Sequence, residues 1–143
     1  EGQGRSWRPT TVVSGEAERR IPIVGDVAAG VPLLAQESID GWVTVAGVRE
    51  GQTVFALRVR GDSMTGAGIL DGDLAIIRQQ HTAEDGEIVL ALVDEEGATI
   101  KRWRHHGPTV TLQAENPAHA PVTLPIERVQ VQGKVIGLRR DYP

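Results

Sequence analysis

Ser63 and Lys101 are the two residues of this chain whose types and surroundings best fit covalent chemistry. Ser63 stands in the sequence Gly-Asp-Ser-Met at residues 61–64, and Lys101, one of only two lysines, stands in an alternating run that predicts a strand. A serine hydroxyl becomes an effective nucleophile when a neighbouring base removes its proton. A lysine can be that base only when neutral, which costs about 4 kcal/mol for an ordinary amine near pH 7.4 and less for a buried one. The two residues therefore predict a Ser–Lys dyad in which the fold buries Lys101 beside Ser63.

Other assignments of these residues stay open from the sequence alone. A Ser-His-Asp triad would need a histidine base. The four candidates stand in contexts typical of exposed loops: His81, His105, His106 and His119. The residues around Ser63 also fit an ordinary helix N-cap, and Lys101 also fits an outward-facing strand residue. If the dyad is real, we expect the backbone N–H groups of Asp62 and Ser63 to hold the oxyanion of a tetrahedral intermediate.

A bond between small residues lies upstream of both. Ala28, Ala29 and Gly30 leave a carbonyl carbon open to attack, and Val27 with Ala28 would be recognised before the bond. Apolar residues frame it on both sides: Ile21, Ile23, Val27, Val31, Leu33 and Leu34. Such a segment fits a peptide that docks on the protein's own surface or swings away from it. A plain loop between two elements is the alternative.

The hydrophobic pattern predicts an all-β domain. Short alternating or apolar runs are separated by turn residues, and a hairpin with Lys101 on its return strand is expected over residues 88–103. We expect seven or eight strands in a strongly twisted, partly closed sheet, and at most one short helical turn near residues 64–70.

Composition limits the functional classes. The length of 143 residues fits one domain, and a net charge of −4 argues against a nucleic-acid-binding surface. Because the chain has no cysteine, disulfides and thiolate metal sites are excluded, and we expect neither a metal nor a cofactor. No apolar run approaches the ~20 residues of a membrane span. Residues 1–20 are expected to be a linker from an N-terminal helix-turn-helix domain, residues 21–143 the functional domain, and the protein cytoplasmic.

Taken together, these residues resemble the LexA family of self-cleaving SOS repressors over roughly positions 21–140. The matching positions are Val27–Gly30, Pro32–Gln36, Asp62, Met64, Gly68, Asp71–Asp73, Ala114–Pro117 and Gly133–Gly137. The resemblance implies a fold of the LexA and signal-peptidase type and a cut between Ala29 and Gly30. UmuD-type polymerase subunits share the dyad but typically present Cys-Gly at the cut, so Ala29 favours LexA.

The resemblance also implies a function and partners. The expected function is that of a serine endopeptidase domain of a homodimeric repressor, which cuts itself when RecA filaments on single-stranded DNA activate it. Operator DNA would be bound through the N-terminal domain and not through residues 21–143. The alternatives are a UmuD-like subunit of an error-prone polymerase, a signal-peptidase-like protease acting in trans, and a dimerisation module with a vestigial dyad.

Overall fold

A computed structural model describes residues 18–141 of the chain. This part consists of strands and three single 3₁₀ turns. The strands are β1 (Arg19–Val24), β2 (Ile39–Val45), β3 (Val54–Arg58), β4 (Leu74–Gln79), β5 (Ile88–Val93), β6 (Ala98–His106), β7 (Thr109–Gln113), β8 (Val122–Pro125) and β9 (Val129–Arg139). The 3₁₀ turns are Gln36–Ser38, Thr65–Ala67 and Ile126–Arg128.

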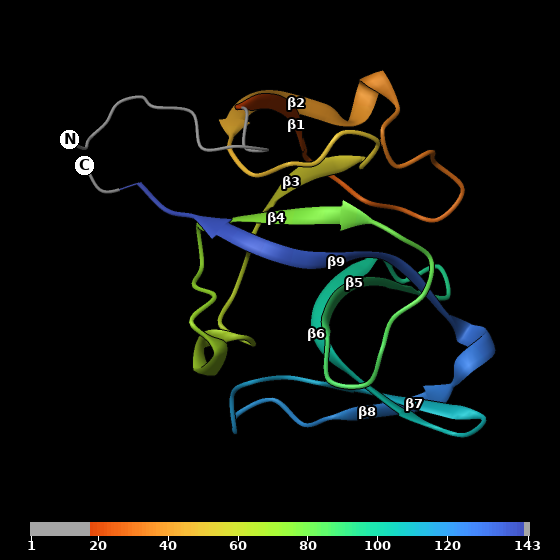
Figure 1. The fold of residues 1–143 in the computed structure, drawn as a ribbon. Helices are drawn as coiled ribbons and strands as arrows, with labels where there is room; N and C mark the ends of the chain where they lie inside the picture. Colours follow the sequence, from red (N-terminus) through yellow and green to blue (C-terminus); the bar gives the residue numbers. More distant parts are fainter. Residues whose placement is uncertain (1–17, 142–143) are drawn as a thin grey trace.

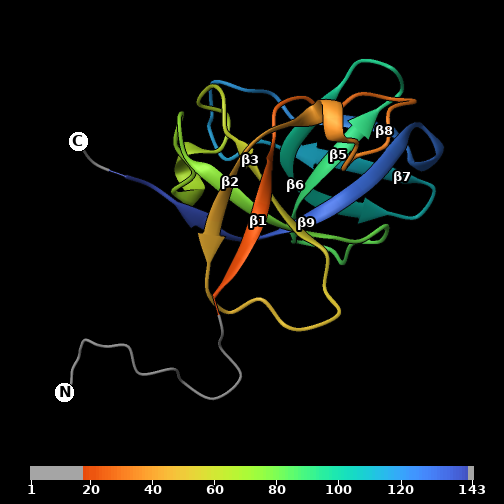
Figure 2. The ribbon, with the colours of Figure 1, turned by 90° about the horizontal axis from the view of Figure 1, so that it is seen from above.

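All the strands join one mixed sheet, which confirms the predicted all-β class. The order is β2-β1-β3-β4-β9-β5-β6-β7-β8, and every neighbouring pair is antiparallel except β1 and β3. The sheet is strongly twisted, with β1 and β2 at one end, β7 and β8 at the other, and β9 crossing between them (Figures 1 and 2). By its hydrogen bonds it is open, because β2 and β8 are its two edges.

The described residues contain nine strands, against the seven or eight expected. β1 begins at Arg19, two residues before the expected start of the domain, and residues 1–17 of the expected linker lie outside the described part. Two apolar runs of the sequence, 129–131 and 134–138, form the single strand β9, which pairs with β5 through Lys134 and with β4 from Gly133 onward. Register shifts in both ladders let one long strand serve two neighbours, and a bulge of this kind leaves no clear sequence signal.

The expected hairpin over residues 88–103 is present, as β5 and β6. Its turn needs left-handed backbone at Asp94 and Gly97, with φ of 48° and 102°. Asparagine, aspartate and glycine tolerate this region best, so the local sequence selects the turn and thereby the register that places Lys101.

Three apolar clusters stabilise the sheet. The first matters most for the candidate site because it joins β1, β3 and β5 through Val24, Phe55 and Leu90 and also contains Met64, which is 2% exposed. The second surrounds Trp103 between β5 and β8, and the third lies between β1, β3 and β4. Within residues 18–141, no helix has the length and apolar character of a membrane span.

Gly133 marks the closest approach of β9 and β4. A Cβ at this position would lie 2.5 Å from Ile77 Cγ2 and 2.7 Å from the Arg78 carbonyl oxygen, well inside the ~3.5–4.0 Å of a favourable contact. We expect Gly133→Ala to lower the free energy of unfolding by about 1–3 kcal/mol, measured by urea denaturation. Gly41→Ala is the matched control, because its Cβ would meet nothing closer than Ile23 Cδ1 at 3.7 Å. Equal stability of the two variants would contradict the prediction.

Candidate active site

The fold brings Ser63 and Lys101 together. Lys101 Nζ lies 3.2 Å from Ser63 Oγ, although the two residues are 38 positions apart in the chain. Nζ also lies 2.6 Å from Thr99 Oγ1 and 3.2 Å from the Ile100 carbonyl oxygen. A neutral amine in this position can donate two N–H groups to Thr99 and Ile100 and keep its lone pair for the Ser63 hydroxyl. The geometry therefore suits proton transfer from Oγ to Nζ.

The end of β3 and the start of β4 hold the turn that carries Ser63. Gly61 is in left-handed backbone with φ of 88°, and its N–H donates to Asp71 Oδ1 at 2.7 Å. The N–H of Val59 donates to the Asp73 carbonyl oxygen at 2.8 Å. Met64, the next residue after Ser63, is buried in the first apolar cluster. Ser63 is thus fixed between a hydrogen-bonded turn and a core side chain.

An ion pair with a buried carboxylate reinforces the same turn. Asp73 is 1% exposed, and both of its carboxylate oxygens accept hydrogen bonds from Arg140, at 2.6 and 2.7 Å. Oδ2 also accepts the Leu70 N–H at 2.8 Å. The hydrogen bonds from Arg140 lower the pKa of Asp73 against the opposing effect of burial, so the carboxylate stays ionised. The end of β9 is thereby joined to the loop that follows Ser63.

Lys101 reaches Ser63 from a stretch of β6 that is paired only on the side of β5. β7 pairs with β6 only from Arg102 onward, so the outer edge of β6 is open from Ala98 to Lys101. This edge borders a cavity of about 340 Å³ that Ser63 and Met64 also line, together with the end of β3 and residues 25–27. Ile100 packs against the first apolar cluster beside it.

Partial burial lowers the pKa of Lys101 below the ordinary value for lysine. The cause is desolvation, which disfavours the ammonium. The unfolded chain keeps the ordinary lysine pKa near 10.4. The burial penalty on the stability of the folded state is therefore largest below the folded pKa, and it falls to zero as the pH rises from the folded pKa to about 10.4. The result is a lysine that is more often neutral, and so more often able to act as a base, than an exposed one.

Within the described residues, the backbone N–H of Ser63 has no hydrogen-bond acceptor, whereas the N–H of Asp62 interacts with its own side-chain carboxylate. A free N–H donor beside Oγ is what an oxyanion site requires. The carbonyl oxygens of the same residues are engaged: Asn116 Nδ2 donates to Asp62 at 2.9 Å, and the Glu115 N–H donates to Ser63 at 2.8 Å. These bonds orient the peptide planes of the turn.

The expected cleavage segment is only partly at the cavity. Val27 is half-buried and lines it, whereas Ala28, Ala29 and Gly30 are exposed and lie outside its lining. Gly30 is in left-handed backbone with φ of 81°, in a turn. Leu33 and Leu34 pack against the first apolar cluster. The small-residue bond therefore projects into solvent between two anchored apolar flanks.

The sequence did not indicate several contacts of this site. Thr99 has a recognisable signal, because it stands two residues before Lys101 on the same strand. Asp73, Glu115 and Asn116 stand in stretches that resemble the family, but the sequence did not indicate that they or Arg140 contact the serine turn, because these contacts form only through the fold. No histidine of the described part hydrogen-bonds to Ser63, and His119 instead lies 2.7 Å from Asp62 Oδ1, where it lowers the pKa of that carboxyl.

The lowered pKa of Lys101 can be measured directly by NMR titration of the lysine side-chain amines. With only two lysines in the chain, a Lys101→Met variant assigns the signals by loss of one. We expect the Lys101 signal to titrate with a midpoint below the ordinary value of about 10.4 because burial disfavours its ammonium form. A midpoint at or above that value would show that Lys101 is solvated or held as a cation.

Comparison with known protein families agrees with this geometry. Residues 22–136 match the family described as Peptidase S24-like, a range that contains Ser63, Lys101 and the bond between Ala29 and Gly30. The family implies a serine peptidase. Because the match covers most of the chain, the protein belongs to the Peptidase S24-like family.

Proposed function

We propose that this chain is a self-cleaving regulatory domain in which Ser63 attacks the bond between Ala29 and Gly30 with neutral Lys101 as base. The observation that carries the proposal is the 3.2 Å separation of Lys101 Nζ and Ser63 Oγ at a cavity that Val27 also lines. The proposed nucleophile, the proposed base and Val27, which precedes the bond by two residues, thus meet at one cavity in the same polypeptide.

The proposed steps follow from the contacts. Lys101 Nζ takes the hydroxyl proton of Ser63 while Oγ bonds to the carbonyl carbon of Ala29, and the N–H groups of Asp62 and Ser63 receive the oxyanion. The ammonium then returns its proton to the Gly30 nitrogen as the peptide bond breaks, which leaves an ester between Ser63 and Ala29. Lys101 then takes a proton from water as the water oxygen bonds to the Ala29 carbonyl carbon, and it gives that proton to Ser63 Oγ as the ester C–O bond breaks, which frees the Ala29 carboxyl group.

The position of the bond between Ala29 and Gly30 would control when self-cleavage occurs. Because Ala29 and Gly30 project into solvent, the described arrangement holds the bond outside the cavity, and cleavage requires the turn to move inward. Such a docked state would also remove water from Lys101 and lower its pKa further. An activator needs only to favour the docked state over the exposed one.

The resemblance to LexA motivates the biological role within this proposal. RecA filaments on single-stranded DNA would be the activator, and the cut would separate this domain from a DNA-binding domain and so end repression. A UmuD-like polymerase subunit and a signal-peptidase-like protease acting in trans are the competing assignments. They predict, respectively, binding to a polymerase and cleavage of added polypeptides.

A homodimer through the second half of β9 is part of the proposal. Val129 and Val131 are buried in the second apolar cluster, but Ile136 and Leu138 are 42% and 39% exposed. β5 pairs with β9 only as far as Lys134, so one edge of β9 is open beyond that residue. A two-fold axis here would pair two open edges and cover the exposed apolar side chains.

The first prediction from this function concerns the pH dependence of self-cleavage. The intact chain should cut itself between Ala29 and Gly30 with a rate that rises with pH until Lys101 is fully neutral and then levels off. Mass spectrometry of the two fragments gives the site, and gel densitometry gives the rate. A flat profile from about pH 7 to about pH 10, or a rate constant that grows with protein concentration, would contradict a cleavage in cis by a lysine base.

Substitutions at the dyad form the second prediction. Ser63→Ala and Lys101→Ala should each abolish cleavage without loss of the fold, as judged by circular dichroism. Lys101→Arg should be equally inactive, because a guanidinium stays protonated and cannot accept the serine proton. Clear cutting by the arginine variant would mean that a different base serves Ser63.

The third prediction concerns oligomeric state. Multi-angle light scattering should report a dimer for the wild-type domain and a shift toward monomer for Ile136→Asp with Leu138→Asp, since charges on the covered face oppose association. Val122→Asp is a control, because Val122 is 50% exposed and belongs to the edge strand β8, which β5, β6 and β7 separate from β9. A monomeric wild-type domain at micromolar concentration would refute an interface in this part of the chain.

A further inference from the structure

An ion pair connects the strand of Lys101 to the segment that holds the Ser63 turn. Arg102 directly follows Lys101 in β6, and its Nε donates to Glu115 Oε1 at 2.5 Å. The two side chains are 24% and 26% exposed, so the pair is shielded from most of the solvent. Arg102 Nη1 also donates to the Gly86 carbonyl oxygen at 2.6 Å, which fixes the guanidinium against the loop before β5.

Glu115 also makes two backbone hydrogen bonds to the serine turn. Its N–H donates to the Ser63 carbonyl oxygen at 2.8 Å, and its carbonyl oxygen accepts the Gly66 N–H at 2.7 Å. The approach is close enough to require glycine, because a Cβ on Gly66 would lie 2.5 Å from the Glu115 oxygen. A displacement of Glu115 would therefore move both ends of the stretch from Ser63 to Gly66.

We propose that Arg102 and Glu115 are positioning residues that set the distance between Ser63 Oγ and Lys101 Nζ. The inference rests on the proposed chemistry of that dyad. One path from β6 runs through the Lys101 side chain to Oγ, and a second runs through Arg102 and Glu115 to the Ser63 backbone. Fixed at both ends, the turn cannot drift from the base. Neither side chain contacts the reacting atoms, so both act through the backbone of the turn.

The test uses a readout that does not depend on the natural substrate. A fluorophosphonate probe labels an activated serine, so its rate of reaction with Ser63 reports the dyad alone, with Ser63→Ala as the blank. Glu115→Ala and Arg102→Met break the pair from opposite ends and should each slow labelling roughly 10- to 100-fold, the effect expected from a displacement near 1 Å. Glu115→Gln keeps an acceptor oxygen for Arg102 and should restore a rate near that of the wild type.

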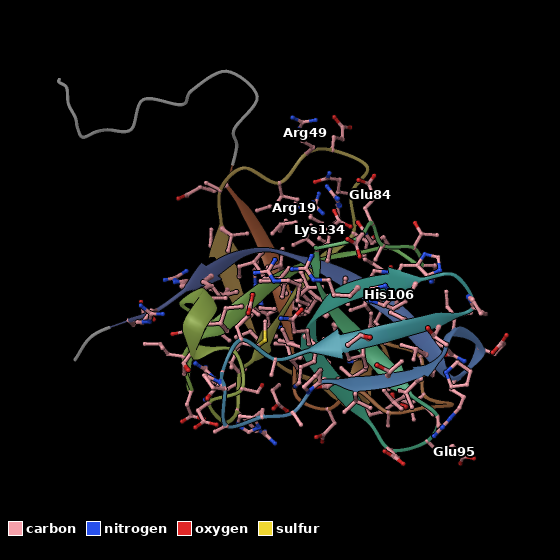
Figure 3. The ribbon with its side chains drawn as sticks, turned by 90° about the horizontal axis from the view of Figure 1, so that it is seen from below. Arg19, Arg49, Glu84, Glu95, His106 and Lys134 are labelled. Atoms are coloured by element: carbon pink, nitrogen blue, oxygen red, sulfur yellow. The ribbon has the colours of Figure 1, made fainter. Side chains whose placement is uncertain are left out.

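Glu87→Ala is the matched control. Glu87 pairs with Lys134 at 2.7 Å, and these side chains are 19% and 33% exposed, close to the values for the Arg102 pair. Glu87 follows Gly86, which Arg102 contacts, but no hydrogen bond joins its side chain to the Ser63 turn: its partners are Lys134 and the N–H of Glu84, which lie on the side of Figure 3 opposite Glu95. This variant should lose a similar amount of stability in thermal denaturation while labelling at the wild-type rate.

Two results would overturn the inference: wild-type labelling rates in both Glu115→Ala and Arg102→Met, or an equal loss of rate in Glu87→Ala. Self-cleavage is followed in the same samples. If the wild type labels at Ser63 but does not cut itself, the proposed self-cleavage fails while the labelling series still decides the role of the ion pair. If the wild type does not label, both the dyad and its positioning are refuted.

Discussion

The rest of the structure depends on how strongly water hydrates the amine of Lys101. An ordinary lysine near neutral pH is about a thousandfold more often an ammonium than an amine, so Lys101 needs a poorly hydrated site to serve as a base. In the proposed mechanism, full burial of this site would also exclude the carbonyl that Ser63 attacks. The structure meets both demands partway: Lys101 is half-buried at the open edge of β6, beside a cavity large enough for a peptide segment. Its pKa is lowered, and Ser63 remains accessible.

Partial burial places strict demands on the polar groups around it. An amine withdrawn from water needs partners of fixed geometry, and Thr99 and the Ile100 carbonyl provide them. The serine turn needs equal rigidity, which comes from the Asp73–Arg140 pair on one side and from Glu115 on the other. These supports come from β6, from the loop after β7 and from the end of β9. The strand order of the sheet therefore matters mainly because it brings segments that are distant in the chain to the serine turn.

Under the proposed function the chain carries its own substrate, which changes the step that needs control. Tethering gives the bond a high effective concentration at the dyad, so chemistry would be fast whenever the bond is docked. With Val27 at the cavity and Leu33 and Leu34 on the core, only the short turn between them has to move. Under the proposed function, the equilibrium of this turn limits the rate, and regulation needs no change in the catalytic groups.

The sequence by itself determined the features that depend on neighbouring residues. Alternation and turn residues specified an all-β domain and the β5–β6 hairpin, and the scarcity of lysines singled out Lys101. The residues that flank Ser63, namely Gly61, Asp62 and Met64, indicated the candidate nucleophile. The tertiary structure decided what depends on strand order and register: β1, β2 and β8, the continuity of β9, and the contacts of Glu115, Asn116 and Arg140 with the serine turn. It alone placed Ala29 and Gly30 outside the cavity. The reason is that these contacts join residues far apart in the chain, and their geometry follows from bulges and packing that no local pattern encodes.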